Sequence, residues 1–331
     1  MTSSTTRRPV GGRASGRPPA WIPFLAGRLG FAVLVVVCVQ VVVFLITHTL
    51  NSPARLMLPA TASTEQVARL ERQLGYDRPL LAQLWDLLTG SLTLDFGRSY
   101  WQQVPAGGLV LDRLPATLVL VALSIALAVA VAVPLGVLAA TRRDSWWDRI
   151  AVTVSLVGVS VPAFWLGYLL ILLLSVRLGV LPTSGVGTPA HYVLPVVTLA
   201  VLPLGRLTQI VRSSMIDELG QQYMLVHLAS GLRGRTRIYR HGLKNAGITI
   251  LTMTGWEVAR LISGFTVVVE VVYNWPGVGL LAVQAIKHND IPLLIATVTI
   301  IAVLIVALNF LLDLAYAALD PRLRATRREG T

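Results

Sequence analysis

The sequence has little charge and almost no cysteine. Only 13% of its 331 residues are charged, whereas a soluble domain carries about 25%. Its single cysteine, Cys38, lies within an apolar run, where we interpret it as a small lipid-facing or packing residue. No disulfide can form within the chain, so cysteine gives no indication of the redox compartment.

Motifs for catalysis are also missing. The sequence contains no G-x-x-x-x-G-K-[ST], no G-x-S-x-G and no H-E-x-x-H, which are the signatures of phosphate-binding loops, serine hydrolases and zinc proteases. Its five histidines are scattered without metal-ligand spacing. We therefore expect no enzyme activity, no bound metal and no cofactor on this chain.

What the chain has in quantity is apolar sequence. Hydrophobic residues make up 54% of it, in runs that alternate with short segments rich in Arg and Lys. Continuously apolar runs of about 20 residues predict membrane-spanning helices, whereas the strands of a β-barrel would alternate with a period of two. We predict an all-α polytopic membrane protein with about six spans, at 29–47, 115–140, 150–174, 192–211, 246–272 and 291–318.

Around this transmembrane domain, 29–322, lie polar segments. We expect a disordered basic tail at 1–28, an external segment at 48–114 with an amphipathic helix near Thr64–Leu74, a cytoplasmic loop at 212–245 and a short tail at 323–331. A cleaved signal peptide is the alternative for the first run. That run is long for a signal peptide and no small-x-small cleavage site follows it, so we favour an uncleaved span.

The distribution of basic residues predicts the orientation. With the amino terminus in the cytoplasm, the cytoplasmic segments are 1–28, 141–149, 212–245 and 319–331. They hold 18 basic and 6 acidic residues, and the difference of +12 equals the net charge of the whole chain. We therefore expect a cell-membrane protein with both termini in the cytoplasm, in contact with the lipid bilayer. Nucleic acid is not needed as a partner to explain the charge.

The cytoplasmic loop 212–245 predicts two short helices broken at Gly231. Before the break, Leu219, Tyr223 and Val226 follow helical spacing and predict one apolar face that enters a groove on a partner. After it, Arg237, Arg240 and Lys244 share a face. Anchoring to lipid headgroups remains an equal alternative for these basic residues.

Three ionisable residues fall inside predicted spans. Glu257 and Arg260 are three residues apart on one helical face, and Arg206 lies in the span before. Such residues are expected to face the bundle or water. Two interpretations stay open: they line the solute path and offer both signs of charge to a zwitterion, or they form a buried pair that fixes helix packing.

The segment 273–279 follows the fifth predicted span on the external side. Trp275, Pro276 and Gly277 predict irregular backbone there. Irregular backbone near membrane depth is tolerated only where protein buries it or a cavity hydrates it. We interpret it as a re-entrant element near an external gate, with an ordinary turn carrying an interfacial Trp275 as the alternative.

The loop around Gly231 resembles the EAA loop of binding-protein-dependent ABC importer permeases, in the dipeptide/oligopeptide/nickel branch. The matching residues are Tyr223, Ala229, Gly231, Leu232, Arg240, His241, Leu243, Asn245 and Ala246, and the departures are Leu225, His227 and Ser230. Similar segments occur along nearly the whole chain, at 74–80, 94–100, 113–117, 161–167, 177–182, 270–277 and 319–322. At 51–54 the chain reads N-S-P-A where that family commonly has G-D-P-A.

This resemblance implies the membrane domain of a type I ABC importer, of the longer permease type. It implies a heterodimer with a second permease, two ATPase subunits that bind ATP-Mg and dock on the loop containing Leu219, Tyr223, Val226, Ala229, Gly231 and Leu232, and an extracellular or periplasmic solute-binding protein. The solute stays open among dipeptides, oligopeptides, glutathione, haem and nickel chelates.

A secondary transporter or channel that acts without an ATPase is the main alternative. Secondary transporters often carry inverted repeats of similar halves, and we find no such repeat here. A membrane enzyme is the third class considered, and the sequence offers no site for one.

Overall fold

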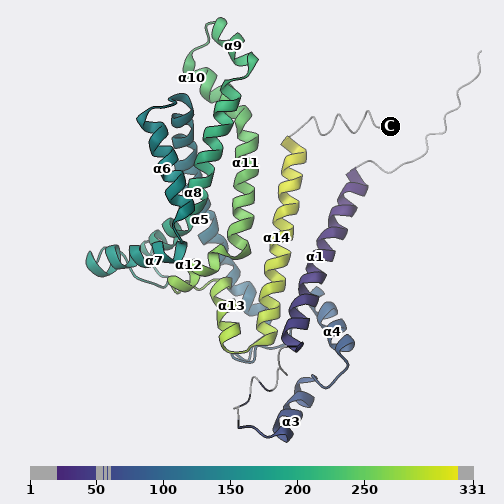
Figure 1. The fold of residues 1–331 in the computed structure, drawn as a ribbon. Coiled ribbons are helices and arrows are strands. Elements are labelled where there is room, and N and C mark those ends of the chain that lie inside the picture. The colour runs from purple at the N-terminus through teal and green to yellow at the C-terminus, as the bar shows by residue number, and fades with distance from the viewer. Residues whose placement is uncertain (1–20, 50–54, 56–57, 59–60, 320–331) are drawn as a thin grey trace, which may run out of the picture.

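The computed structural model describes residues 21–49, 55, 58 and 61–319 (Figure 1). These residues form helices and the segments that connect them. The one β-type contact within the described residues is an isolated bridge between Arg98 and Pro105. The predicted all-α class is confirmed. Residues 1–20 of the predicted tail 1–28 and all of the predicted tail 323–331 lie outside the described residues. The prediction of a disordered tail is wrong for residues 21–28, which are helical.

Long apolar helices form the body of the molecule. Within the described residues, four helices are long and apolar enough to cross a membrane, and a bent pair would make a fifth span. The four are α1 (Trp21–Thr49), α5 (Ala106–Thr141), α8 (Ala190–Leu219) and α14 (Ile291–Leu319).

The segment predicted as the fifth span, 246–272, is interrupted. It is divided among α11 (Leu243–Arg260), the π-helical turn η3 (Leu261–Phe265) and α12 (Thr266–Val272). The remaining short elements are α3 (Thr64–Leu74), α4 (Leu80–Leu92), α9 (Gln222–Ala229), α10 (Gly234–Thr236), η2 (Arg237–Gly242) and α13 (Val278–Lys287).

Helix α3 has the bounds predicted from sequence. Its first turn is closed by a capping box, in which Ser63 Oγ accepts from the Gln66 amide and Gln66 Oε1 accepts from the Ser63 amide. Its end is set by Gly75, whose φ of 75° is the left-handed conformation that glycine adopts without steric cost.

A sharp bend divides the predicted span 150–174. Helix α6 (Trp146–Ser160) ends before Pro162, and α7 (Ala163–Leu170) continues through η1 (Ile171–Arg177) at 101° to it. Val161 is extended (ψ 121°), as expected for a residue before proline. In Figure 1 α7 therefore projects sideways from the bundle instead of continuing α6.

Helix α5 lies in the core and packs most extensively on α8, which also contacts α6 and α11. The α6–α8 crossing is close because two glycines meet there. A Cβ added to Gly158 would lie 2.7 Å from the Val201 carbonyl oxygen and 3.1 Å from Gly205 Cα. Ser155 Oγ also donates to the Gly205 carbonyl at 2.7 Å. Small residues and interhelical hydrogen bonds are how helices associate in lipid.

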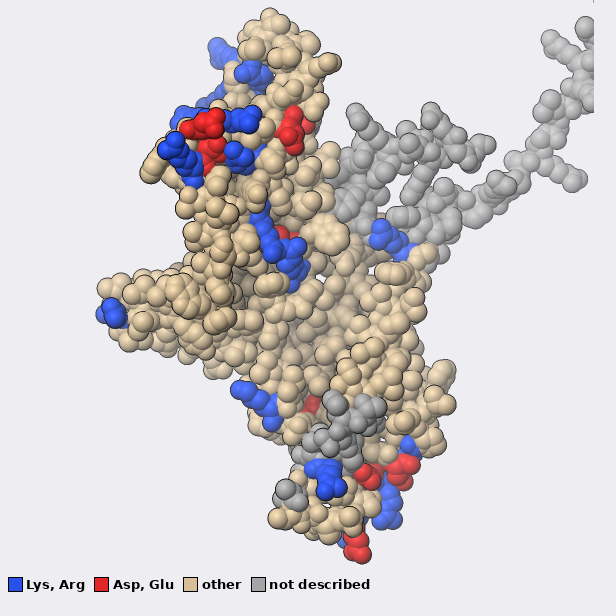
Figure 2. Space-filling model, viewed as in Figure 1, with Lys and Arg blue, Asp and Glu red and all other residues tan. Residues whose placement is uncertain are grey.

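The two ends of the bundle carry different elements. The first turn of α1 and the last turn of α14 lie at the same end as α9 and α10, while α3, α4 and α13 lie at the opposite end (Figure 1). Charged side chains gather towards both ends in Figure 2, and the band between them is mostly uncharged. This distribution is that of a helical protein whose middle faces hydrocarbon.

Candidate functional site

Helix α9 presents apolar side chains to the outside. Leu225, Val226 and Leu228 expose 64%, 62% and 56% of their surface, and Ala229 is also exposed. The chain then turns at Gly231, as predicted, with a φ of 72°, and Leu232 remains 36% exposed.

The prediction that Leu219, Tyr223 and Val226 share one helical face is wrong. Leu219 is the last residue of α8, and α9 begins only at Gln222. The Leu219 side chain packs against the core cluster that contains Met215 and Val211. Helix α8 continues this far because no glycine or proline interrupts it between Gly205 and Gly220.

A polar cluster fastens α9 to the two long helices beside it. The Tyr223 hydroxyl donates to Glu218 Oε1 at the end of α8. Asn245 Nδ2, from the start of α11, donates to Glu218 Oε1 at 3.1 Å and to the Tyr223 hydroxyl at 2.9 Å. Burial raises the pKa of the Tyr223 phenol, and the hydrogen bond to Glu218 raises it further. The phenol is therefore protonated and a donor at neutral pH, and the cluster links α9 to both α8 and α11.

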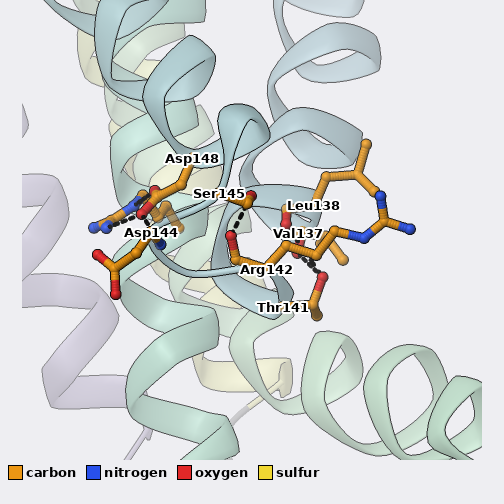
Figure 3. Close-up of polar contacts among 8 residues, drawn as sticks. Val137, Leu138, Thr141, Arg142, Asp144, Ser145 and Asp148 are labelled. Carbon is orange, nitrogen blue, oxygen red and sulfur yellow. Dashed lines mark hydrogen bonds and ion pairs between the residues drawn. The ribbon is translucent and has the colours of Figure 1, made fainter.

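A partly buried ion pair holds the start of α6 against α8. Arg212 donates to Asp148 through two bonds, Nε to Oδ1 at 2.5 Å and Nη2 to Oδ2 at 3.0 Å. The Asp144 amide also donates to Asp148 Oδ2 at 3.1 Å. Figure 3 shows Asp144 in the turn between α5 and α6 and Asp148 in the first turn of α6. Two parallel bonds to one guanidinium fix orientation as well as distance, so the turn and α8 are held as one unit.

The three predicted intramembrane charges lie together. Glu257 Oε1 accepts from Arg260 Nη1 at 2.9 Å, and Arg206 Nη1 lies 3.6 Å from the same oxygen. The Glu257 side chain is 4% exposed, while Arg206 and Arg260 are 32% and 37% exposed. A single buried carboxylate is therefore paired with two arginines whose side chains are about a third exposed.

A second buried carboxylate organises the segment after α12. Glu270 is fully buried. Its Oε1 accepts from Thr117 Oγ1 of α5 at 2.7 Å, and its Oε2 accepts from the Leu280 amide of α13 at 2.9 Å. Thr117 Oγ1 also accepts from the Val278 amide at 2.9 Å. Glu270 and Thr117 thus hold the first turn of α13 against α5 through amide and hydroxyl donors.

The irregular segment between α12 and α13 is packed inside the protein. Trp275 is 1% exposed, and its Nε1 donates to the Ala116 carbonyl at 3.1 Å. The Tyr273 hydroxyl lies 2.8 Å from Thr198 Oγ1 of α8. The alternative of an ordinary turn with an interfacial Trp275 is wrong, because this side chain is enclosed by its own chain. Pro276 and Gly277 belong to this packed connection.

Two family descriptions match the sequence. "Binding-protein-dependent transport system inner membrane component" matches residues 132–325, and the corresponding amino-terminal family matches residues 21–121. Relatives include the glutathione transport system permease protein GsiC of Salmonella choleraesuis strain SC-B67, 37% identical, and GsiC of Escherichia coli K12, 36% identical. Each alignment covers 86% of this chain and 94% of the relative.

The chain therefore belongs to the binding-protein-dependent transport permeases. It is the membrane permease subunit of an ABC importer, and ATP hydrolysis takes place on separate ATPase subunits. Membership also implies a partner permease and a solute-binding protein in general terms. The identification made from sequence resemblance is confirmed.

Four residues that organise this permease were given no role from sequence: Asp148, Glu218, Glu270 and Thr117. Glu270 had a signal, because it is the one acid within T-V-V-V-E-V-V, and a carboxylate in an apolar segment requires partners. Asp148 and Glu218 lie in polar segments, where the sequence gives no signal that an acid is buried or bonded. Their bonds to Arg212, Tyr223 and Asn245 depend on how the helices pack together.

Proposed function

We propose that this permease forms one half of the channel of an importer for di- or oligopeptides or a related small polar solute. The exposed apolar side of α9 carries the proposal, because apolar side chains on a short helix outside the bundle favour a partner's groove. The similarity to glutathione permeases along nearly their whole length supports a peptide-like solute.

In the proposed assembly this chain pairs with a second, shorter permease. Two ATPase subunits bind ATP-Mg on the cytoplasmic side, and a solute-binding protein docks on the other side; this chain itself binds no cofactor. Both termini of the chain are in the cytoplasm. The start of α1 and the end of α14 lie at the same end of the bundle as α9, which supports that orientation, as does the excess of basic residues in the cytoplasmic segments.

Leu225, Val226, Leu228 and Ala229 form the proposed docking surface for an ATPase subunit. Tyr223 positions α9 through Glu218 and Asn245. Gly231 and Leu232 end the docking segment and lead into α10. ATP-driven movement of the ATPase subunit would then reach α8 and α11, in which Arg206, Glu257 and Arg260 lie.

We propose that these three charged residues line the solute path. A charged side chain facing hydrocarbon at the centre of a bilayer costs at least about 2.5–3.5 kcal/mol, so the exposed sides of Arg206 and Arg260 require water or protein in front of them. At the external end, the packed segment with Trp275, Pro276 and Gly277 contributes to the gate, because Glu270 and Thr117 link it to α5.

Reconstitution of the complete complex tests this function. Proteoliposomes with both permeases and the ATPase subunits, supplied with the solute-binding protein, are expected to take up labelled Ala-Ala-Ala or glutathione only when ATP is present. The control omits the ATPase subunits. Uptake by this chain alone, driven by an ion gradient, would instead establish the secondary-transporter alternative.

A further inference from the structure

The arrangement of charge around Glu257 is asymmetric. The Glu257 side chain lies deepest, with 4% of its surface exposed, and the side chains of Arg206 and Arg260 are 32% and 37% exposed. The group carries one negative and two positive charges. A solute that approaches the exposed sides of Arg206 and Arg260 therefore meets a net positive charge, and the Glu257 carboxylate lies deeper.

This group also has unused hydrogen-bonding capacity. Within the described residues, Arg206 Nη1 and Glu257 Oε2 are buried atoms without a hydrogen-bond partner. Arg206 Nη1 is 3.6 Å from Glu257 Oε1, an ion-pair distance that is too long for a good hydrogen bond. A guanidinium has five N–H donors in a planar fork, so Arg206 retains donors for a ligand.

A cavity lies next to Arg206. It has a volume of about 280 Å³ and is lined by the break between α6 and α7 (Ser160, Val161 and Pro162), by Thr198 of α8 and by Phe265. Most of its wall is apolar. A hydrogen bond to a charged donor is stronger in such surroundings than in water, so one guanidinium at this wall is enough to select the sign of a group that enters.

We propose that Arg206, assisted by Arg260, forms a transient subsite for a carboxylate of the passing solute. This inference rests on the proposed function and adds a charge preference to it. The planar fork of Arg206 donates to both oxygens of a carboxylate. Glu257 competes for the same donors from behind, which keeps the bound anion weakly held, and weak holding is what passage through a channel requires.

Matched tripeptides measure the preference directly. The complete complex is reconstituted, and ATP-driven uptake of Ala-Glu-Ala and Ala-Lys-Ala is measured separately, each at saturating concentration with one solute-binding protein throughout. The ratio of the two rates is compared between permease variants. Selection by the binding protein cancels in this comparison, because it is the same in every sample.

Arg206→Gln is expected to change the ratio about tenfold towards Ala-Lys-Ala, which is the effect of losing one charge-assisted interaction. Arg206→Lys should keep most of the preference for Ala-Glu-Ala. Arg177→Gln, at an exposed arginine at the end of η1, is the matched control and should leave the ratio unchanged.

An unchanged ratio in Arg206→Gln, with normal uptake by the unsubstituted complex, would overturn the subsite. If Arg206→Gln does not assemble, Arg260→Gln serves as the second variant, and an unchanged ratio there has the same meaning. Absence of ATP-driven uptake of every peptide by the unsubstituted complex is a different result. It would reject the proposed function itself.

Discussion

The buried carboxylates of Asp148, Glu257 and Glu270 are bonded in three different arrangements. Asp148 is paired with one guanidinium through two bonds. Glu270 has hydroxyl and amide donors. Glu257 shares one oxygen between two arginines and leaves the other without a partner in the described structure. The first two arrangements satisfy the charge and hold helices together, and the third leaves bonding capacity for a ligand.

Asp148→Asn is expected to destabilise the permease by about 3 kcal/mol, because it leaves the partly buried Arg212 without its counter-charge. The measurement is the loss of folded protein during heating in detergent. Asp144→Asn is the control, since the same change in the turn before α6 (Figure 3) keeps the Asp144 amide that donates to Asp148. Equal stability of the two variants would show that the ion pair contributes nothing.

Gly277→Ala is expected to destabilise the connection between α12 and α13. A Cβ at this position would lie 2.1 Å from Glu270 Oε1, so the buried carboxylate must move, at a cost of about 1–3 kcal/mol. Thermal stability and uptake should both fall. Gly234→Ala is the control, because no atom lies within 4 Å of its added Cβ. A Gly277→Ala variant as stable as Gly234→Ala contradicts the described packing.

Sequence spacing predicts the contact of Glu257 with its partner but not that of Glu270. Glu257 and Arg260 are three residues apart on a helix, so their contact could be predicted, and the hydrogen bond at 2.9 Å confirms it. Thr117 and Glu270 are 153 positions apart in the sequence. Their contact depends on α5 lying beside α12 and α13, which periodicity does not reveal.

At the scale of helices, α9 is a short element in the connection between the long helices α8 and α11. The sequence predicted a short helix before Gly231 but placed its start too early, because apolar spacing continues across Gly220 without showing where α8 ends. The exposed face consequently consists of Leu225, Val226, Leu228 and Ala229. The side of α9 that turns inward carries Met224, which is buried, and Tyr223, which bonds to Glu218 and Asn245 in the polar cluster.

Tyr223→Phe tests the mechanical role of that cluster. It removes the hydroxyl bonded to Glu218 and Asn245, which is worth about 1 kcal/mol, so α9 should move more independently of α8 and α11. We expect about a fivefold lower uptake per ATP hydrolysed, with the ATPase subunits still bound. Tyr239→Phe, the same change at an exposed residue of the same loop, should have no effect. An unchanged ratio of uptake to hydrolysis in Tyr223→Phe would reject the role.

The bend at Pro162 is a second feature that the sequence predicts only in part. Proline predicted an interruption in the third span, and the structure has one there. The angle of 101° is set by the packing of α7 against α12 and α8, and no local sequence pattern encodes it. Exposed aromatic residues on α7, such as Phe164 and Trp165, therefore face outward from this chain.

At the scale of the molecule, the distribution of apolar and basic residues along the sequence predicted the class, an all-α polytopic membrane protein. Long apolar runs separated by basic segments are typical of this class. The similarity to known permeases, which covers 86% of the chain, agrees with it. The exposed arginines and the sideways helix α7 depend on tertiary structure.

The most direct test of the account is whether ATPase subunits bind the exposed side of α9. Tagged permease is purified from cells that express the whole complex, and the co-purified ATPase is quantified for Leu225→Glu and for Leu92→Glu. Both leucines are exposed, by 64% and 85%, and they lie at opposite ends of the bundle. We predict that Leu225→Glu loses most of the bound ATPase and that Leu92→Glu keeps it. Full ATPase binding by Leu225→Glu would contradict the account.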